Sequence, residues 1–158
     1  MCSDQVFAVN QTLRQTLVID TNIVLDLFLF DDAPVLRTAL QRGQVAWLAT
    51  PDMREELARV LSYPSIVLQQ ARFQRSAQQI LQGFDDNARL MPVPMRASIL
   101  CEDADDQKFL DLAVAHQAAL LSKDQALLRL AKRLSCQGVS VKAKFSDLSA
   151  TLTCQTAP

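Results

Sequence analysis

The sequence predicts a three-layer α/β/α domain with a mainly parallel central sheet. Short apolar runs alternate with segments of helical period along the chain, which is typical of strands joined by crossover helices. The chain has 158 residues, of which 49% are hydrophobic, so it suits one domain with one buried core. No repeat or linker is visible, and we divide the chain into an N-terminal extension of unassigned role (1–16), a domain (17–148) and a C-terminal tail (149–158).

Charge and cysteine content argue against several classes of protein. Lys and Arg number 16 and Asp and Glu 17, so nucleic-acid binding would need a local patch or a bound metal. The four cysteines lie far apart without C-x-x-C spacing, and there is a single histidine, which argues against a zinc site or a disulfide framework. No segment resembles a signal peptide, and no apolar run reaches the roughly 18 residues that span a bilayer. We therefore expect a soluble, cytoplasmic protein with reduced thiols.

Turn and cap residues place the elements of the first half. The apolar residues 23–30 predict a helix buried on more than one side, by this domain or by a partner. Thr50 and Pro51 are an N-cap residue and a first-turn proline, a strong start signal for a helix. The predicted elements are a strand at 17–19, helices at 23–30 and 34–42, a strand at 45–49 and a helix at 51–61.

The second half continues the alternation. Residues 65–86 have helical period and predict a helix that ends near Gly83. An acidic cluster at 102–106 opens a further helix, as expected at the positive end of a helix dipole. Ser146 is the predicted cap of a short final helix. The other predicted elements are strands at 87–93, 119–121 and 139–141 and helices that end at residues 116 and 134.

Two carboxylates follow predicted strands directly. Asp20 comes after the strand at 17–19, and Asp124 ends the sequence Ser122-Lys123-Asp124 after the strand at 119–121. In open α/β sheets the ligand site lies outside the carboxyl ends of the strands. Each aspartate could instead cap the helix that follows it.

Two further carboxylates are phased toward the core. Each residue turns a helix by about 100°, which places Glu56 at the edge of the apolar stripe of its helix and Glu55 on the opposite face. In the later acidic helix Asp106 lies roughly 15° from the centre of the buried side, whereas Asp105 lies near its border. Ordinary explanations are a boundary position for Glu56 and helix-dipole complementation for Asp106. A charge in phase with the core is costly unless it is paired or bound to metal.

These four carboxylates together predict a metal site. In one pocket they would repel one another and take up protons unless a cation lay among them. Mg²⁺ or Mn²⁺ prefers oxygen ligands, and such ions activate water in phosphodiester hydrolysis. A phosphatase with an aspartyl nucleophile would need a second Asp where Asn22 stands, and a receiver domain would need paired aspartates near the first strand. A single histidine gives triad chemistry little support.

At these positions the chain resembles the PIN-domain ribonuclease family, from Leu17 to about Leu148. Residues 20–22 (D-T-N) resemble the opening family motif, and Glu56 in R-E-E-L matches the helical E-L. Residues 103–110 (D-A-D-D-Q-K-F-L) resemble the D-x-D-D-x-K-F-L of the branch regarded as toxins of bacterial toxin–antitoxin pairs. Ser122-Lys123-Asp124 resembles the T-x-D that follows the fourth strand.

The resemblance implies a PIN-like domain and a metal-dependent endoribonuclease that cleaves single-stranded RNA. The implied ligands of Mg²⁺ or Mn²⁺, and the catalytic residues, are Asp20, Glu56, Asp106 and Asp124. Asn22 and Ser122 would orient carboxylates or water, and Asp103 would be a peripheral ligand or would support the ligands from behind them. The chain departs from the family pattern in its longer start before the first Asp and in Ser122, where Thr is commoner.

Basic residues indicate where RNA could bind. Arg54, beside Glu56, and Lys123 are the predicted phosphate contacts. Arg129, Lys132 and Arg133 lie opposite an apolar stripe, which favours an ordinary solvated face. A toxin would require an antitoxin protein. It could dock on the 23–30 helix, which could instead be core or a homodimer face, or on the arginines near the Glu56 helix, which are Arg54, Arg59, Arg72 and Arg75. The alternative function is a non-catalytic PIN-like scaffold that binds RNA or protein without cutting.

Overall fold

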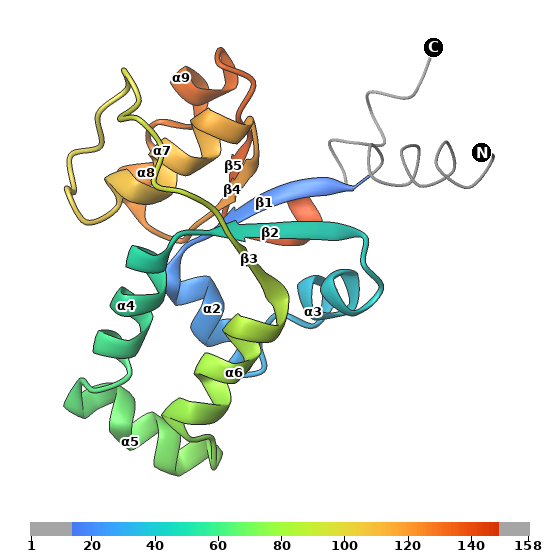
Figure 1. Ribbon diagram of the computed structural model, residues 1–158, viewed down its shortest axis with the longest axis vertical. Helices are drawn as coiled ribbons and strands as arrows, with labels where there is room; N and C mark the ends of the chain where they lie inside the picture. The colour runs from blue at the N-terminus through green and yellow to red at the C-terminus, as the bar shows by residue number, and fades with distance from the viewer. Residues whose placement is uncertain (1–13, 149–158) are drawn as a thin grey trace.

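The protein is built on a parallel β-sheet. The computed structural model describes residues 14–148, and within them the sheet has five strands in the order β3-β2-β1-β4-β5, all parallel (Figure 1). The strands are β1 (Gln15–Ile19), β2 (Val45–Ala49), β3 (Ala88–Leu90), β4 (Ala119–Leu121) and β5 (Val141–Lys142). The α/β fold class predicted from sequence is confirmed. The predicted tail (149–158) and the residues 1–13 lie outside the described part, and β1 already begins at Gln15.

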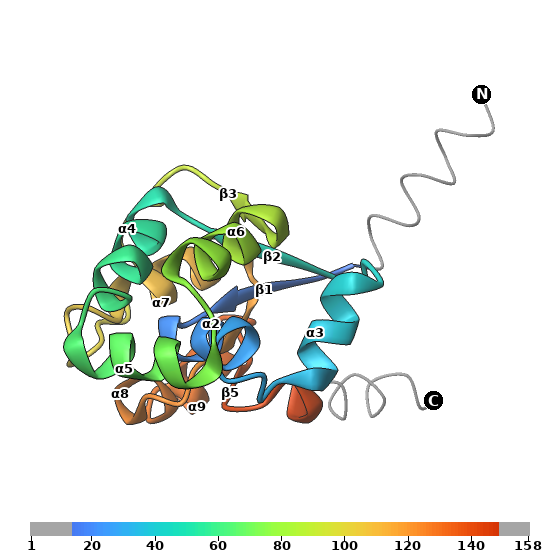
Figure 2. The ribbon, with the colours of Figure 1, turned by 90° about the horizontal axis from the view of Figure 1, so that it is seen from below.

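Helices flank the sheet on both faces. The helices of the structure are α2 (Thr21–Phe28), α3 (Pro34–Gln41), α4 (Pro51–Val60), α5 (Pro64–Phe73), α6 (Ala77–Asn87), α7 (Gln107–His116), α8 (Gln125–Leu128) and α9 (Ala131–Ser135). The chain adds β2 and β3 on one side of β1 and then β4 and β5 on the other side. Because parallel crossovers are right-handed, α2 to α6 cover one face of the sheet and α7 to α9 cover the other. These groups lie below and above β1 and β2 in Figure 1, and the view from below shows α2 in the middle of its layer (Figure 2).

The predicted helix at 65–86 is two helices. α5 ends where Gln74 adopts a left-handed conformation (φ 53°), and Ser76 then starts α6 with a capping box to Gln79. The S-x-x-Q spacing is a helix-start signal that overrides the continuous helical period. Gly83 does not close the helix but lies inside α6, where an added Cβ would be 2.7 Å from the ring of Phe28. The glycine therefore lets α6 approach α2 closely.

The last elements also differ from the prediction. The helix expected after Asp124 is divided at Leu130 into α8 and α9, and both short helices pack on β5. Each places one leucine, Leu127 or Leu134, in the core. The final strand begins at Val141 rather than at residue 139. Ser146 lies within the helical residues 145–148 and is not their cap.

The core forms around the central strands and α2. Leu17, Val18 and Ile19 of β1 are all buried, as expected for a parallel strand covered on both faces. α2 also lies in this core, with six of its eight residues buried, so its apolar character needs no partner to explain it. α5, at the edge of the molecule farthest from the sheet in Figure 1, buries no residue.

Two expectations about the whole chain are tested only within the described part. Cys101 and Cys136 are free thiols there. Among residues 14–148, no helix is long and apolar enough to cross a membrane.

Candidate metal centre

Asp20 and Asp124 lie at the carboxyl ends of the adjacent strands β1 and β4. The strand order changes direction here, and this is where open α/β sheets form a crevice for ligands. Ser122 joins the two aspartates: its hydroxyl donates to Asp20 Oδ2 at 2.7 Å and accepts the backbone N–H of Asp124 at 3.0 Å. Ser122 is fully buried, so this bridge is shielded from water.

The helix-cap explanation applies to one of these aspartates. Asp124 accepts the backbone N–H of Ala126 at 2.9 Å and so caps α8. Asp20 precedes α2, yet within the described residues its side chain makes no cap hydrogen bond to that helix. Its carboxylate is held by Ser122 instead, facing the end of β4.

α7 brings Asp106 to the same edge of the sheet. The helix packs on β1 and β4, and Asp106 precedes its first turn. Asp106 is buried, with 7% of its surface exposed, whereas Asp105 is exposed, as the helical phase predicted. Its Oδ2 atom is buried and has no hydrogen-bond partner among residues 14–148. A buried carboxylate oxygen without a donor is costly, so this atom is matched to a ligand that supplies positive charge.

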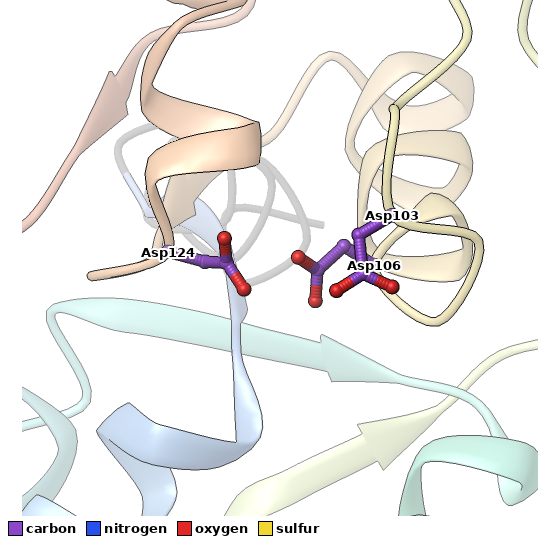
Figure 3. A group of neighbouring side chains, drawn as sticks. All are labelled: Asp103, Asp106 and Asp124. Atoms are coloured by element: carbon purple, nitrogen blue, oxygen red, sulfur yellow. The ribbon is translucent and has the colours of Figure 1, made fainter.

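Three aspartates, including Asp106, converge at this edge of the sheet. Asp103, Asp106 and Asp124 each offer one carboxylate oxygen, and these atoms lie within 4.8 Å of one another. Figure 3 shows the carboxylates of Asp106 and Asp124 pointing toward each other, with Asp103 beside Asp106. Asp103 is exposed, but its Oδ1 accepts the backbone N–H of Asp105 at 2.9 Å, which fixes the side chain at the site. An all-carboxylate set suits a hard cation such as Mg²⁺ or Mn²⁺.

The electrostatics of the site favour a cation. Burial raises the pKa of Asp106 to about 8, helped by a hydrogen bond shared with Asp124 and by the charges of Asp20, Asp124 and Asp103. Burial also raises the pKa of Asp20, although the Ser122 hydroxyl partly offsets the effect. Without a cation the pocket therefore retains a proton that bare aspartates would lose at neutral pH. A divalent ion would replace that proton.

Glu56 faces the pocket but lies outside the three-aspartate cluster. It is half-buried on α4, and its charge contributes to the raised pKa of Asp20. Its Oε2 accepts the Thr21 hydroxyl at 2.5 Å, and its Oε1 accepts the Lys108 ammonium at 2.6 Å. Both oxygens are thus already hydrogen-bonded. Neither Lys108 nor Thr21 was singled out from the sequence, although Lys108 is the lysine of the 103–110 motif.

The remaining predicted residues lie around this centre. Asn22 is exposed on α2. Arg54 makes a bidentate ion pair with Asp85 of α6, at 2.7 and 2.9 Å, which holds the pKa of that carboxyl low. Lys123 forms an ion pair with Asp26 of α2. Both predicted phosphate contacts are therefore paired with a carboxylate of this domain.

Comparison with known proteins places the site in a family. A protein-family model described as a PIN domain matches residues 16–143, well over half of the chain. The matched segment contains Asp20, Glu56 and the whole three-aspartate cluster. No curated protein matches the sequence.

Proposed function

The chain belongs to the PIN domain family, whose members are in general metal-dependent nucleases, and we propose that it is a Mg²⁺- or Mn²⁺-dependent endoribonuclease acting on single-stranded RNA. The observation that supports this most strongly is the convergence of Asp103, Asp106 and Asp124, whose carboxylates each bring one oxygen within 4.8 Å of the others. Asp20 and Glu56 lie outside that cluster, and we propose them as further acidic residues of the site because their charges raise or accompany the raised pKa of its buried aspartates.

The three-aspartate cluster would hold the cation. Its members come from the loop before α7, the start of α7 and the end of β4, so their spacing is set by the packing of α7 on the sheet. A bound Mg²⁺ or Mn²⁺ would lower the pKa of a coordinated water and offset negative charge on the phosphate.

The other residues prepare the pocket. Ser122 fixes the carboxylate of Asp20, whose charge acts on Asp106, and Asp20 would orient a water by accepting its proton in a hydrogen bond. In the hydrolysis the water oxygen forms a bond to phosphorus, one P–O ester bond breaks, and the departing ribose oxygen takes up a proton. The chain needs no co-reactant other than water for this step.

Two matched variants test the proposal. Asp106→Asn removes the buried carboxylate, whereas Asp105→Asn makes the same chemical change on an exposed neighbour. With single-stranded RNA and Mn²⁺, we expect Asp106→Asn and Asp20→Asn to lose roughly 10²- to 10³-fold in rate and Asp105→Asn to cleave like wild type. Equal cleavage by all four proteins would contradict the proposal. Absence of both cleavage and Mn²⁺ binding by calorimetry would favour the alternative, a PIN-like scaffold that binds RNA or protein.

The finer proposal is that the protein is the toxin of a bacterial toxin–antitoxin pair in the cytoplasm. Its support is the likeness of residues 103–110 to that branch. Expression of the wild-type chain should arrest growth, co-expression of an adjacent gene should relieve the arrest, and Asp106→Asn should be harmless. Harmless expression of an active nuclease would refute the toxin role. A homodimer is a further possible assembly of the chain, and size-exclusion chromatography with light scattering would show whether it forms.

A further inference from the structure

Lys108 forms an ion pair with Glu56, and about a quarter of its side chain is exposed. Its ammonium donates to Glu56 Oε1 at 2.6 Å and to the backbone carbonyl of Asp105 at 3.0 Å. These acceptors come from α4 and from the loop before α7, so the lysine is held from two sides. Such double anchoring is unusual for a surface lysine, whose ammonium is normally mobile and solvated.

The ammonium has one donor left. A lysine carries three N–H groups, and Glu56 and Asp105 are its hydrogen-bond acceptors within the described residues. The ammonium also lies 5.3 Å from the centroid of the Phe109 ring. The third N–H has no hydrogen-bond acceptor among the described residues, so it can turn toward an anion. Because the side chain is partly exposed, an anion entering the pocket from solvent can reach it.

Glu56 is arranged to hold this lysine. Lys108 occupies Oε1 and the Thr21 hydroxyl occupies Oε2, so both carboxylate oxygens already accept a donor. The three aspartates that can share a cation do not include Glu56. The positive charge at the Glu56 side of the pocket is thus supplied by the chain itself.

We propose that Lys108 is a fixed cation of the active site: anchored by Glu56, it takes the place of a second metal ion and binds a phosphate oxygen of the RNA at the bond that is cut. This inference rests on the proposed nuclease function, and it says which groups supply the positive charge that the phosphate meets. The aspartate cluster holds a single divalent ion, and Lys108 neutralises the other side of the phosphate. Glu56 is then a positioning residue, and Lys108 is a catalytic one.

Metal binding alone provides the first test, without RNA. Isothermal titration calorimetry with Mn²⁺ should show a single ion per wild-type chain. Lys108→Ala should bind the first Mn²⁺ several-fold more tightly, because it removes the positive charge paired with Glu56, whose own charge acts on Asp20. Lys132→Ala, an exposed lysine on α9, is the matched control and should bind like wild type. Two Mn²⁺ ions in the wild type, or weaker binding by Lys108→Ala, would overturn the proposal.

Cleavage provides the second test. Lys108→Ala should lower kcat by roughly 10²-fold, and Lys108→Arg should recover part of the loss. Glu56→Gln should lower kcat similarly, and the double variant should lose little more than either single one, because both changes affect the same ammonium. Additive losses, or an unchanged kcat in Lys108→Ala, would refute the role. Thermal melting confirms that each variant is folded.

The two tests separate this inference from the proposed function. If the wild-type protein cuts no RNA, the nuclease proposal fails, and the Mn²⁺ titration still decides whether Lys108 acts as the second cation of the pocket. If the wild type cuts RNA but Lys108→Ala matches it, the nuclease stands and the role of Lys108 fails.

Discussion

The Ser122 hydroxyl donates a 2.7 Å hydrogen bond to Asp20 across the boundary between β4 and β1. The two residues are 102 positions apart in the chain, and the bond is fully enclosed by the fold. It connects the two strands whose ends carry Asp20 and Asp124. The carboxylates of the candidate site therefore depend on the pairing of β1 with β4 for their positions.

Ser122→Ala should destabilise the protein by about 1–3 kcal/mol, because it leaves a buried carboxylate oxygen without its donor. Since the hydroxyl lowers the raised pKa of Asp20, the loss should be larger at pH 8 than at pH 5. Urea unfolding at both pH values measures the effect. Ser135→Ala, which removes an exposed hydroxyl, is the control. A loss in Ser122→Ala no greater than the control would show that the bridge has no energetic role.

The metal-free protein should lose stability as pH rises from 3.8 to about 8. Asp106 keeps its proton in the folded state up to a pKa of about 8, whereas the unfolded chain releases it near pH 3.8, the ordinary pKa of an aspartate. The contribution to stability is therefore fully present below the unfolded pKa and is lost as pH rises through the folded pKa. Melting temperatures measured in EDTA should fall less steeply with rising pH for Asp106→Asn than for wild type. Asp105→Asn should follow the wild-type curve, and parallel curves for all three would contradict the assignment.

Mn²⁺ should stabilise the protein more at pH 8 than at pH 5.5, because protons on the aspartates compete with the metal. At a free concentration 100 times the dissociation constant, the gain is about 2.7 kcal/mol. Differential scanning calorimetry with and without Mn²⁺ measures it, and EDTA should reverse it. Asp106→Asn should show little gain at either pH. Equal stabilisation of wild type and Asp106→Asn would place the metal elsewhere.

Gly83→Ala should destabilise the fold, although alanine in a helix interior normally favours stability over glycine by about 1 kcal/mol. The new Cβ would lie 2.7 Å from the Phe28 ring, so α6 would have to move away from α2 at a cost of about 1–3 kcal/mol. Urea unfolding shows directly whether the substitution lowers or raises the free energy of unfolding. Combining Gly83→Ala with Phe28→Leu should recover part of the loss. A stabilised single variant would show that the helices have room to adjust.

Most of the fold could be predicted because local signals agreed with the tertiary arrangement. The strands at 45–49 and 119–121 were placed residue for residue, and the start of α4 at Pro51 followed from its cap and proline. The split of 65–86 was missed because apolar periodicity continues through a break that Ser76 and Gln79 specify locally. The division at Leu130 has no comparable signal, since it depends on how α8 and α9 share the surface of β5.

The sequence by itself determined that acidic residues follow two strands and that Asp106, rather than Asp105, faces inward, because strand ends and helical phase are local properties. It also placed the chain near the family that the comparison confirms. Only the tertiary structure decided which carboxylate oxygens of the candidate site lie close to one another. Asp103, predicted as peripheral, lies in the cluster with Asp106 and Asp124, while Glu56 is bonded to Lys108 from 52 positions away. Side-chain distances between distant segments depend on the packing of α7 and α4 at the edge of the sheet, and no local pattern encodes that packing.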